Sequence, residues 1–427
     1  MRQLAFIDWI CWMSALICLL GIAALVGLAF ACSTERSAVN WRTVGLALLL
    51  QASLGALVLY VPAGRVLLES ITAGVAQVLN YAQDGIAFMF GDMAYSEKMG
   101  FIFAFQVLPA IIFFSSLISV LYYVGIMQWI VRVLGGGLSR LLKTSSPESL
   151  AAATNIFIGQ TEAPIAIRPY LAGMTRSELF AVMVGGLCSV AGATMAGYVA
   201  IGVDLKYLIA ASFMAAPGGL AMAKLLLPET PAGSGVARSA ITDTTDTTET
   251  VDETPANVFD AAAQGATSGM MLAVNVGAML IAFVALIALI NGGIGWLGSL
   301  VGFENLKIES ILGYVFSPIA WLMGVPWSEA VNAGSFIGQK LVLNEFIAYI
   351  NLVGTTEGLS DHSRAVVTFA LCGFANFSSI AILLGGLGVM APSRRAEIAT
   401  LGLRALLAAT LANFMSAAIA SFFLYLS

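Results

Sequence analysis

Long apolar runs alternate with short polar stretches along the chain, and this alternation predicts the main elements. The runs are about 20 residues long, the length that a helix needs to cross a hydrocarbon core of about 30 Å. Three amphipathic stretches indicate helices that lie at the membrane interface, at 63–92, 132–143 and 306–325. The apolar runs predict eight membrane-spanning helices, at 4–31, 43–61, 100–130, 178–201, 205–227, 258–290, 363–389 and 397–426.

Two stretches with polar centres fit neither class. Residues 147–173 and 327–353 are each too short to cross the membrane twice and too polar to cross it once. Basic residues lie on both sides of the first stretch, and Lys and Arg collect on the cytoplasmic side of membranes. We therefore expect 147–173 to be a re-entrant hairpin that enters from the cytoplasm. The second stretch has mixed or acidic flanks, which predicts a hairpin from the outside and places both chain termini outside.

An internal repeat relates the two halves of the chain. The sequence Phe-Ile-Gly-Gln occurs at 157–160 and again at 336–339, and a glutamate follows each copy, Glu162 and Glu345. Each half also contains three predicted spans, an odd number, so the second half enters the membrane from the opposite side. Inverted repeats of this kind are typical of secondary transporters, which bind their substrate near the midplane where broken helices meet.

The repeat divides the chain into four expected parts. Residues 229–256 are rich in Thr, Asp and Glu and predict a flexible cytoplasmic linker, because they cannot bury enough apolar surface to fold. The other three parts are an N-terminal scaffold with interfacial helices at 1–99, a first repeat at 100–228 and a second, inverted repeat at 257–427. The predicted fold class is an all-α polytopic membrane protein with eight spans and two re-entrant hairpins.

Composition supports this assignment and excludes several functions. The chain is 59% hydrophobic and only 10% charged, against about 25% charged residues in soluble domains. Its net charge of −5 leaves no basic face for nucleic acid. The five cysteines lie in apolar segments at unrelated spacings, and the single histidine, His362, lies in a polar loop. No zinc-protease or Gly-x-Ser-x-Gly motif is present, so we expect a transporter rather than an enzyme.

Three ionisable residues lie in the hairpins, where burial in a bilayer costs about 2.5–3.5 kcal/mol each and usually marks function. They are Glu162, Lys340 and Glu345. Lys340 either pairs with a carboxylate, caps a hairpin carbonyl or contacts substrate, and the sequence leaves these alternatives open. The surrounding amides and hydroxyls suit a neutral, polyhydroxylated cargo better than a phosphate, which would require several arginines. These neighbours are Asn155, Gln160, Thr161, Asn344, Asn376, Ser378 and Ser379.

Several long motifs resemble those of the concentrative nucleoside transporters. They are FQVLPAIIFFSSLISVLYYVGI at 105–126, GQTEAPIAIRPYL at 159–171, NVFDAAAQGA at 257–266, GQKLVLNEFIAY at 338–349 and CGFANFSSI at 372–380. The resemblance covers nearly the whole chain beyond residue 80. It implies a homotrimer, in which each protomer has a trimerising scaffold and a mobile transport domain, and cation-driven uptake of nucleosides.

The resemblance also implies roles for individual residues. The tip of the first hairpin would read the nucleobase, and the second hairpin and the broken helix after it would hold the ribose. Thr194 takes a position near the base that is often valine, which leaves the base preference open. The implied nucleoside-binding residues are Gly159, Gln160, Thr161, Glu162, Thr194, Glu345, Phe374, Asn376 and Ser379. The implied sodium ligands are the side chains of Asn155 and Ser189 and the carbonyls of Ile158 and Val190.

The expected function is sodium-coupled import of nucleosides such as uridine across a bacterial inner membrane, by alternating access. Proton coupling is the alternative within the class, with Glu162 or Glu345 as the carrier. A channel would instead show currents beyond carrier turnover, and a membrane enzyme would alter its ligand chemically.

Overall fold

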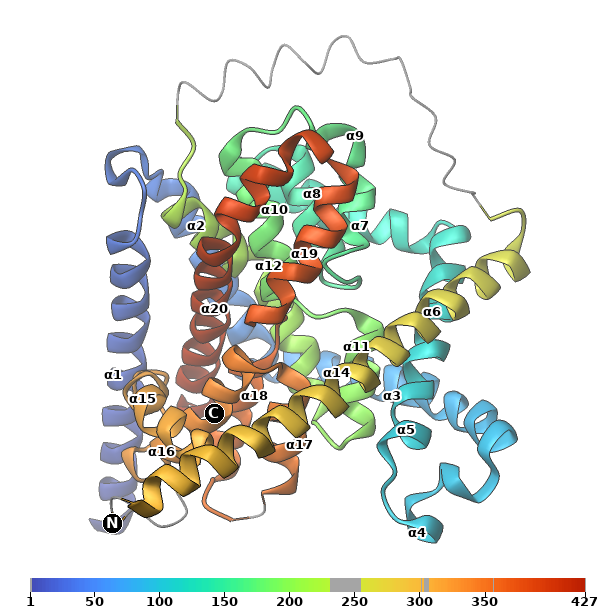
Figure 1. The fold of residues 1–427 in the computed structure, drawn as a ribbon. Coiled ribbons are helices and arrows are strands. Elements are labelled where there is room, and N and C mark those ends of the chain that lie inside the picture. The colour runs from blue at the N-terminus through green and yellow to red at the C-terminus, as the bar shows by residue number, and fades with distance from the viewer. Residues whose placement is uncertain (1, 231–254, 301, 303–306, 356, 427) are drawn as a thin grey trace.

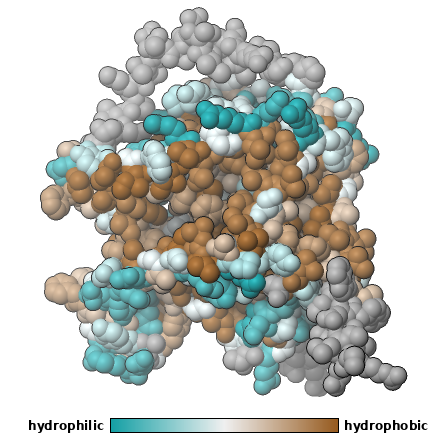
Figure 2. Space-filling view, turned by 180° about the vertical axis from the view of Figure 1, so that it is seen from behind, coloured by the Kyte–Doolittle hydropathy of each residue, from teal (hydrophilic) through white to brown (hydrophobic). Residues whose placement is uncertain are grey.

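The computed structural model describes residues 2–230, 255–300, 302, 307–355 and 357–426. Throughout these residues the regular structure is helical, with no strand. The space-filling view shows an apolar belt across the visible face of the molecule, with polar surface above and below it (Figure 2). The linker expected at 229–256 lies outside the described residues, apart from its first two and last two positions.

Seven stretches among the described residues are long and apolar enough to span a membrane. Two of them are single helices in the N-terminal part, α1 (Arg2–Ala31) and α2 (Trp41–Leu59). The later ones include α12 (Leu205–Leu226), α14 (Val258–Leu300) and α20 (Arg395–Leu426). The remaining two combine short helices, namely α5 (Phe103–Gln106) with α6 (Leu108–Tyr123), and α10 (Arg176–Cys188) with α11 (Gly192–Ala200).

The remaining predicted span, at 363–389, is not a continuous helix. It consists of α18 (Asp361–Leu371) and α19 (Phe377–Met390), separated by an unwound segment. Gly373 in that segment has a φ of +155°, a conformation that favours glycine. Asn376 then caps α19, because its side-chain oxygen accepts a hydrogen bond from the Ser379 N–H. The hydropathy of the segment therefore predicted a span where the local chemistry builds a break.

The amphipathic stretches also form helices, with shifted bounds. Residues 63–92 lie mainly in α3 (Pro62–Phe90) and 306–325 mainly in α15 (Ile308–Leu322). The stretch at 132–143 belongs to α7 (Ile126–Leu142), which begins earlier than predicted because Gly125, with a φ of +90°, turns the chain there.

The two polar stretches form helical hairpins. The first contains α8 (Ser146–Thr154), a turn, the short helix η3 (Ala163–Ile167) and α9 (Arg168–Leu171). The second contains α16 (Trp327–Val342) and α17 (Glu345–Gly354). Figure 1 shows α8 and α9 at one end of the molecule and α16 and α17 at the other, the end where both termini lie. This opposite placement is the arrangement expected of an inverted repeat.

The first hairpin is anchored at its base by a buried ion pair. Lys224 of α12 lies 2.8 Å from Glu148 of α8 and donates to the Ser177 hydroxyl of α10 at 3.1 Å. Glu148 also accepts a hydrogen bond from the Ser145 N–H, which caps α8. These contacts join the base of the hairpin to α10 and α12 and so fix its position against them.

A closely packed pair of helices forms a wall beside the hairpins. α6 and α14 cross at Gly265 and Gly269, where an added Cβ would lie 2.6 Å from Ser119 and 2.7 Å from Ser115. Small residues four positions apart allow membrane helices to approach in this way. Only 22% of the residues in the most apolar segment of α14 are buried, against 94% in the span formed by α10 and α11. The wall therefore stands at the edge of the body formed by the other helices (Figure 1).

Candidate functional site

A cavity of about 1180 Å³ lies between the α6–α14 wall and the unwound parts of the two repeats. All nine residues that the resemblance assigned to nucleoside binding line it. They come from the first hairpin, from α11, from the start of α17, from the break between α18 and α19, and from the first turn of α19. Residues far apart in the sequence thus form the boundary of one space, as the inverted repeat predicts.

The carboxylate of Glu345 is held in place from both sides. Its Oε1 accepts a hydrogen bond from the Tyr198 hydroxyl at 2.9 Å, and its Oε2 accepts one from the Asn376 side-chain amide at 2.8 Å. The Asn376 oxygen is itself fixed by the Ser379 N–H at 2.8 Å and the Ser378 hydroxyl at 2.7 Å. Glu345 is buried, 4% exposed, and lies in the first turn of α17, where the helix dipole favours a negative charge.

This arrangement leaves acceptor capacity for a ligand. Each carboxylate oxygen can accept about two hydrogen bonds, and each Glu345 oxygen receives one from a side chain. Two neighbouring hydroxyls of a sugar could therefore donate to the carboxylate without displacing Tyr198 or Asn376.

Tyr198 was not predicted from the sequence. It lies in the apolar helix α11 and is fully buried, with its ring 4.6 Å from the Phe346 ring. No spacing rule connects residue 198 with residue 345, so only a lone hydroxyl in an apolar helix could have marked it.

If the cavity binds the nucleosides that the resemblance implies, Tyr198→Phe should weaken their binding about tenfold or more, because it removes a hydrogen bond to a charged group worth about 1.5–3 kcal/mol. Equilibrium binding of uridine to the purified protein measures this loss. Tyr349→Phe is the control. The Tyr349 ring lies 4.7 Å from the Tyr198 ring, but its hydroxyl donates to the Thr368 carbonyl and not to Glu345. An equal loss in both variants would contradict the prediction.

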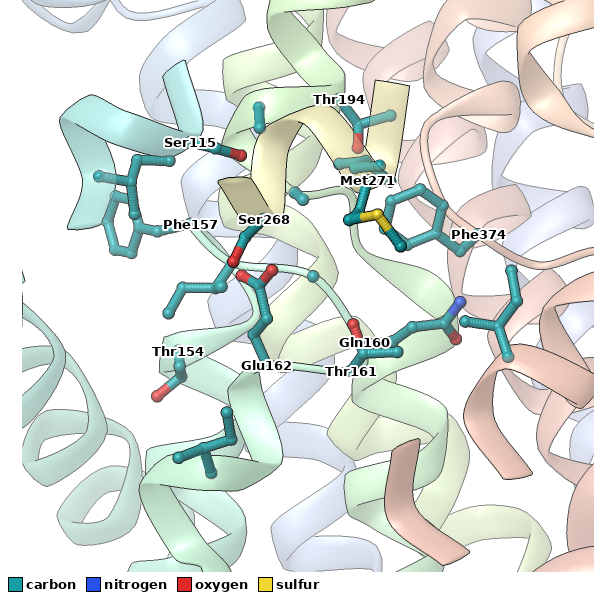
Figure 3. Close-up of a pocket in the computed structure, with 18 of the residues that line it drawn as sticks. Ser115, Thr154, Phe157, Gln160, Thr161, Glu162, Thr194, Ser268, Met271 and Phe374 are labelled. Atoms are coloured by element: carbon teal, nitrogen blue, oxygen red, sulfur yellow. The ribbon is translucent and has the colours of Figure 1, made fainter. Parts of the chain in front are cut away.

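The opposite side of the cavity carries the first-hairpin tip. Figure 3 shows the Glu162 carboxylate directed towards Ser268, and Phe374 beside Met271. Gln160 is buried and its Oε1 has no hydrogen-bond partner, while Glu162 forms no ion pair within the described part of the chain. Both side chains therefore have free polar atoms for a ligand.

Helix α14 contributes lining residues that the sequence analysis missed. Gln264, Ser268, Met271 and Asn275 all face the cavity. Their spacing of four, three and four residues places them on one side of a helix. A polar stripe in an otherwise apolar span was the signal that could have identified them.

Of the four residues assigned to sodium, Ile158 lines the cavity and the other three do not. Two of them, Asn155 and Ser189, lie close to Gly185. Asn155 ends α8, is 2% exposed, and its Oδ1 has no hydrogen-bond partner. Ser189 follows α10 and its hydroxyl donates to the Gly185 carbonyl at 2.8 Å. A Cβ on Gly185 would lie 3.2 Å from the Asn155 amide nitrogen, so both side chains pack against this glycine.

The resemblance also assigns two backbone oxygens to the ion, the carbonyls of Ile158 and Val190. The unwound segments that contain Ile158 and Val190 are joined by a hydrogen bond from the Gly192 N–H to the Phe157 carbonyl at 2.9 Å. Among the hydrogen bonds of the described residues, none reaches the carbonyls of Ile158 or Val190. Amide, hydroxyl and carbonyl oxygens are ligands that a hard cation prefers. No group of three or more His, Cys, Asp or Glu side chains able to hold a metal occurs in the described ranges.

Lys340 does not face the cavity. It is 2% exposed, and its ammonium donates to the Ala370 carbonyl at 2.8 Å and to the Asn413 side-chain oxygen at 2.7 Å. None of the alternatives for this residue holds as stated, because Lys340 caps a carbonyl that belongs to α18 and not to a hairpin.

Comparison with known proteins identifies the family. A family model described as the C-terminus of Na+ dependent nucleoside transporters matches residues 207–421, and its N-terminal counterpart matches 20–93. The chain belongs to the concentrative nucleoside transporter family. A further model, described as nucleoside recognition, matches residues 104–204.

Individual members of the family cover the chain almost completely. The nucleoside permease NupC of Helicobacter pylori is 46% identical over 97% of this chain and 99% of its own length. Sodium/nucleoside cotransporter 1 of Homo sapiens is 38% identical over 97% of this chain and 66% of its own length. The uncharacterized transporter YutK of Bacillus subtilis is 53% identical over 95% of this chain and 98% of its own length.

Solved structures of a family member, CNTnw, share the fold. Its inward-facing, substrate-bound state matches with a TM-score of 0.90 at 53% identity, covering 97% of this chain and 99% of that one. A variant in an outward-facing state matches with a TM-score of 0.93 at 52% identity, covering 98% and 100%. The family resemblance, the all-helical membrane fold and the expectation of a transporter rather than an enzyme are thus confirmed.

Proposed function

We propose that this nucleoside transporter is a sodium-coupled symporter that imports nucleosides across a bacterial inner membrane by alternating access. The observation that carries the sodium coupling is the oxygen cluster beside Gly185, in which the Asn155 Oδ1 is buried without a partner. A buried amide oxygen without a hydrogen bond costs about 1–3 kcal/mol, and a bound cation would remove that cost. The Na+ dependent family description supports the same ion.

Uptake into proteoliposomes tests this proposal against proton coupling. Radiolabelled uridine should accumulate when a sodium gradient is imposed at constant pH, and should not accumulate when only a pH gradient is imposed. Accumulation driven by the pH gradient alone would favour the proton alternative, with Glu162 or Glu345 as the carrier.

We also propose that different residues of the cavity bind the ribose and the base. Glu345, Asn376 and Ser379 would hold the ribose, because a carboxylate, an amide and a hydroxyl satisfy sugar hydroxyls as donors and acceptors. Gly159, Gln160, Thr161 and Glu162 would face the base, with Thr194 and Phe374 beside it.

The base assignment makes a prediction about specificity. Gln160→Ala and Thr161→Ala should each change the relative affinities for different bases by about fivefold, because each removes a hydrogen-bonding group of about 1 kcal/mol from the proposed base side. The penalty for a deoxyribose should stay unchanged. Competition of uridine uptake by other nucleosides and deoxynucleosides measures both effects. Equal loss for all bases, with an altered deoxyribose penalty, would reverse the roles of the two hairpins.

The proposed assembly is a homotrimer with a scaffold and a mobile transport domain in each protomer. The exposed α6–α14 wall provides an apolar surface through which neighbouring protomers could associate. We further propose that both termini lie outside the cell, which agrees with their common position at one end of the molecule (Figure 1).

A further inference from the structure

One buried side chain joins the ends of two broken helices that belong to different repeats. Asn413 of α20 is 1% exposed, and its amide donates to the Cys188 carbonyl at 2.7 Å and to the Cys372 carbonyl at 2.9 Å. Cys188 is the last residue of α10, and Cys372 is the residue that ends α18. Both carbonyls lack their usual helical partner, because the chain unwinds immediately after them.

The unwound segments also contact each other directly. The Phe374 N–H donates to the Ser189 carbonyl at 3.1 Å. An added Cβ on Gly373 would lie 2.5 Å from the Asn413 Oδ1 and 2.7 Å from the Cys188 carbonyl. The two breaks and the Asn413 amide therefore pack without space between them, so one cannot shift without moving the others.

Lys340 completes the junction with a positive charge. Its ammonium donates to the Asn413 Oδ1 and to the Ala370 carbonyl, near the C-terminal end of α18. The C-terminal end of a helix carries a partial negative charge, which a cation stabilises. No carboxylate within the described ranges lies at ion-pair distance from Lys340. In the described part of the chain, the Ala370 carbonyl and the Asn413 oxygen are therefore the two groups that accept hydrogen bonds from this ammonium.

The residues on either side of the junction belong to the two proposed sites. Ser189, a proposed sodium ligand, follows Cys188 directly, and Asn376, a proposed ribose contact, lies four residues after Cys372. Lys340 is on α16, whose chain continues into Glu345 at the start of α17. We propose that Asn413 and Lys340 are positioning residues that couple sodium binding to nucleoside binding. This inference rests on the proposed function and adds the structural connection between its two sites.

Coupling is a measurable quantity. If sodium raises the affinity for a nucleoside by some factor, the nucleoside raises the affinity for sodium by the same factor. Equilibrium binding of uridine to the purified full-length protein, repeated at increasing sodium concentrations, gives this factor without any transport step.

Asn413→Asp is the decisive variant. It keeps an oxygen acceptor for Lys340 but replaces the donor to Cys188 and Cys372 with an oxygen that repels both carbonyls. We expect the wild-type protein to have a coupling factor of about tenfold or more, which is typical of linked sites. In Asn413→Asp we expect this factor to fall to about one. Lys340→Met should reduce it in the same direction. A purely architectural role would lower the yield of folded protein and leave the coupling factor unchanged.

Thr410→Val provides a matched control. Thr410 lies on α20 three residues before Asn413, is buried, and its hydroxyl has no hydrogen-bond partner. This variant should keep the wild-type coupling factor. Wild-type coupling in Asn413→Asp, or an equal loss in Thr410→Val, would overturn the inference while leaving sodium-coupled transport intact. A wild-type protein whose uridine affinity ignores sodium would instead overturn the proposed function, and the inference with it.

Discussion

Replacing Glu345 with glutamine is expected to lower kcat/KM for every transported nucleoside by about 100-fold or more, because two ribose hydroxyls lose a charged acceptor worth about 1.5–3 kcal/mol each. The glutamine would also direct its amide N–H groups at one of the two donors that now bind the carboxylate, Tyr198 or Asn376. A site built to bond a hydroxyl discriminates strongly once its own groups lose their partners. Initial rates of uptake for nucleosides with different bases measure the effect.

Glu309→Gln provides a control with similar chemistry. The Glu309 carboxylate also accepts hydrogen bonds from an asparagine amide, that of Asn291, but Glu309 does not line the cavity. It should transport at the wild-type rate. Normal transport by Glu345→Gln, or a loss confined to one base, would show that the second hairpin does not hold the ribose.

The family resemblance read from the sequence predicted nine residues that line the cavity, but it gave neither the lining residues of α14 nor the contacts that hold the nine in place. Hydropathy located the hairpins because their polar centres, around Gln160 and Lys340, interrupt the apolar pattern. Hydropathy did not reveal the break inside 363–389, which only the resemblance implied, because the average over a window conceals a short break such as the one at Gly373. The same averaging concealed the break at 189–191, which separates α10 from α11 within a predicted span.

The breaks are stabilised by contacts that are distant in sequence. Asn413 satisfies carbonyls 225 and 41 residues away, and Tyr198 contacts Glu345 across 147 residues. Neither partner follows from periodicity, because a helix pattern reveals only neighbours three or four residues apart. Lys340 shows the same limit of sequence analysis. Its position in a hairpin predicted that it is buried, but not that the Ala370 carbonyl and Asn413 are its partners.

A single sodium ion is expected to accompany each nucleoside, because the second repeat has lost the mirror image of the proposed ion site. Aligning the Phe-Ile-Gly-Gln runs places Gly334 opposite Asn155, so that side-chain ligand is missing. Aligning Gly186 with Gly373 places Asn376 opposite Ser189. The Asn376 side chain is already engaged by Glu345 and by the start of α19. We therefore propose that this position has been diverted from ion binding to the sugar side of the cavity.

Asn155→Ala and Ser189→Ala should therefore each raise the sodium concentration for half-maximal uptake by about tenfold or more, the loss that one ligand worth about 1.5 kcal/mol would cause. Asn155→Asp keeps an oxygen at the same place and adds a negative charge, so it should restore sodium affinity to the wild-type value or better. The sodium dependence of wild-type uptake should show a Hill coefficient of about one, since that coefficient cannot exceed the number of sites. A coefficient clearly approaching two would require a second ion site that the diverted Asn376 cannot supply. Unchanged sodium affinity in both alanine variants would show that the unpartnered oxygen of Asn155 serves another purpose, because a true ligand cannot be removed without weakening the ion's shell.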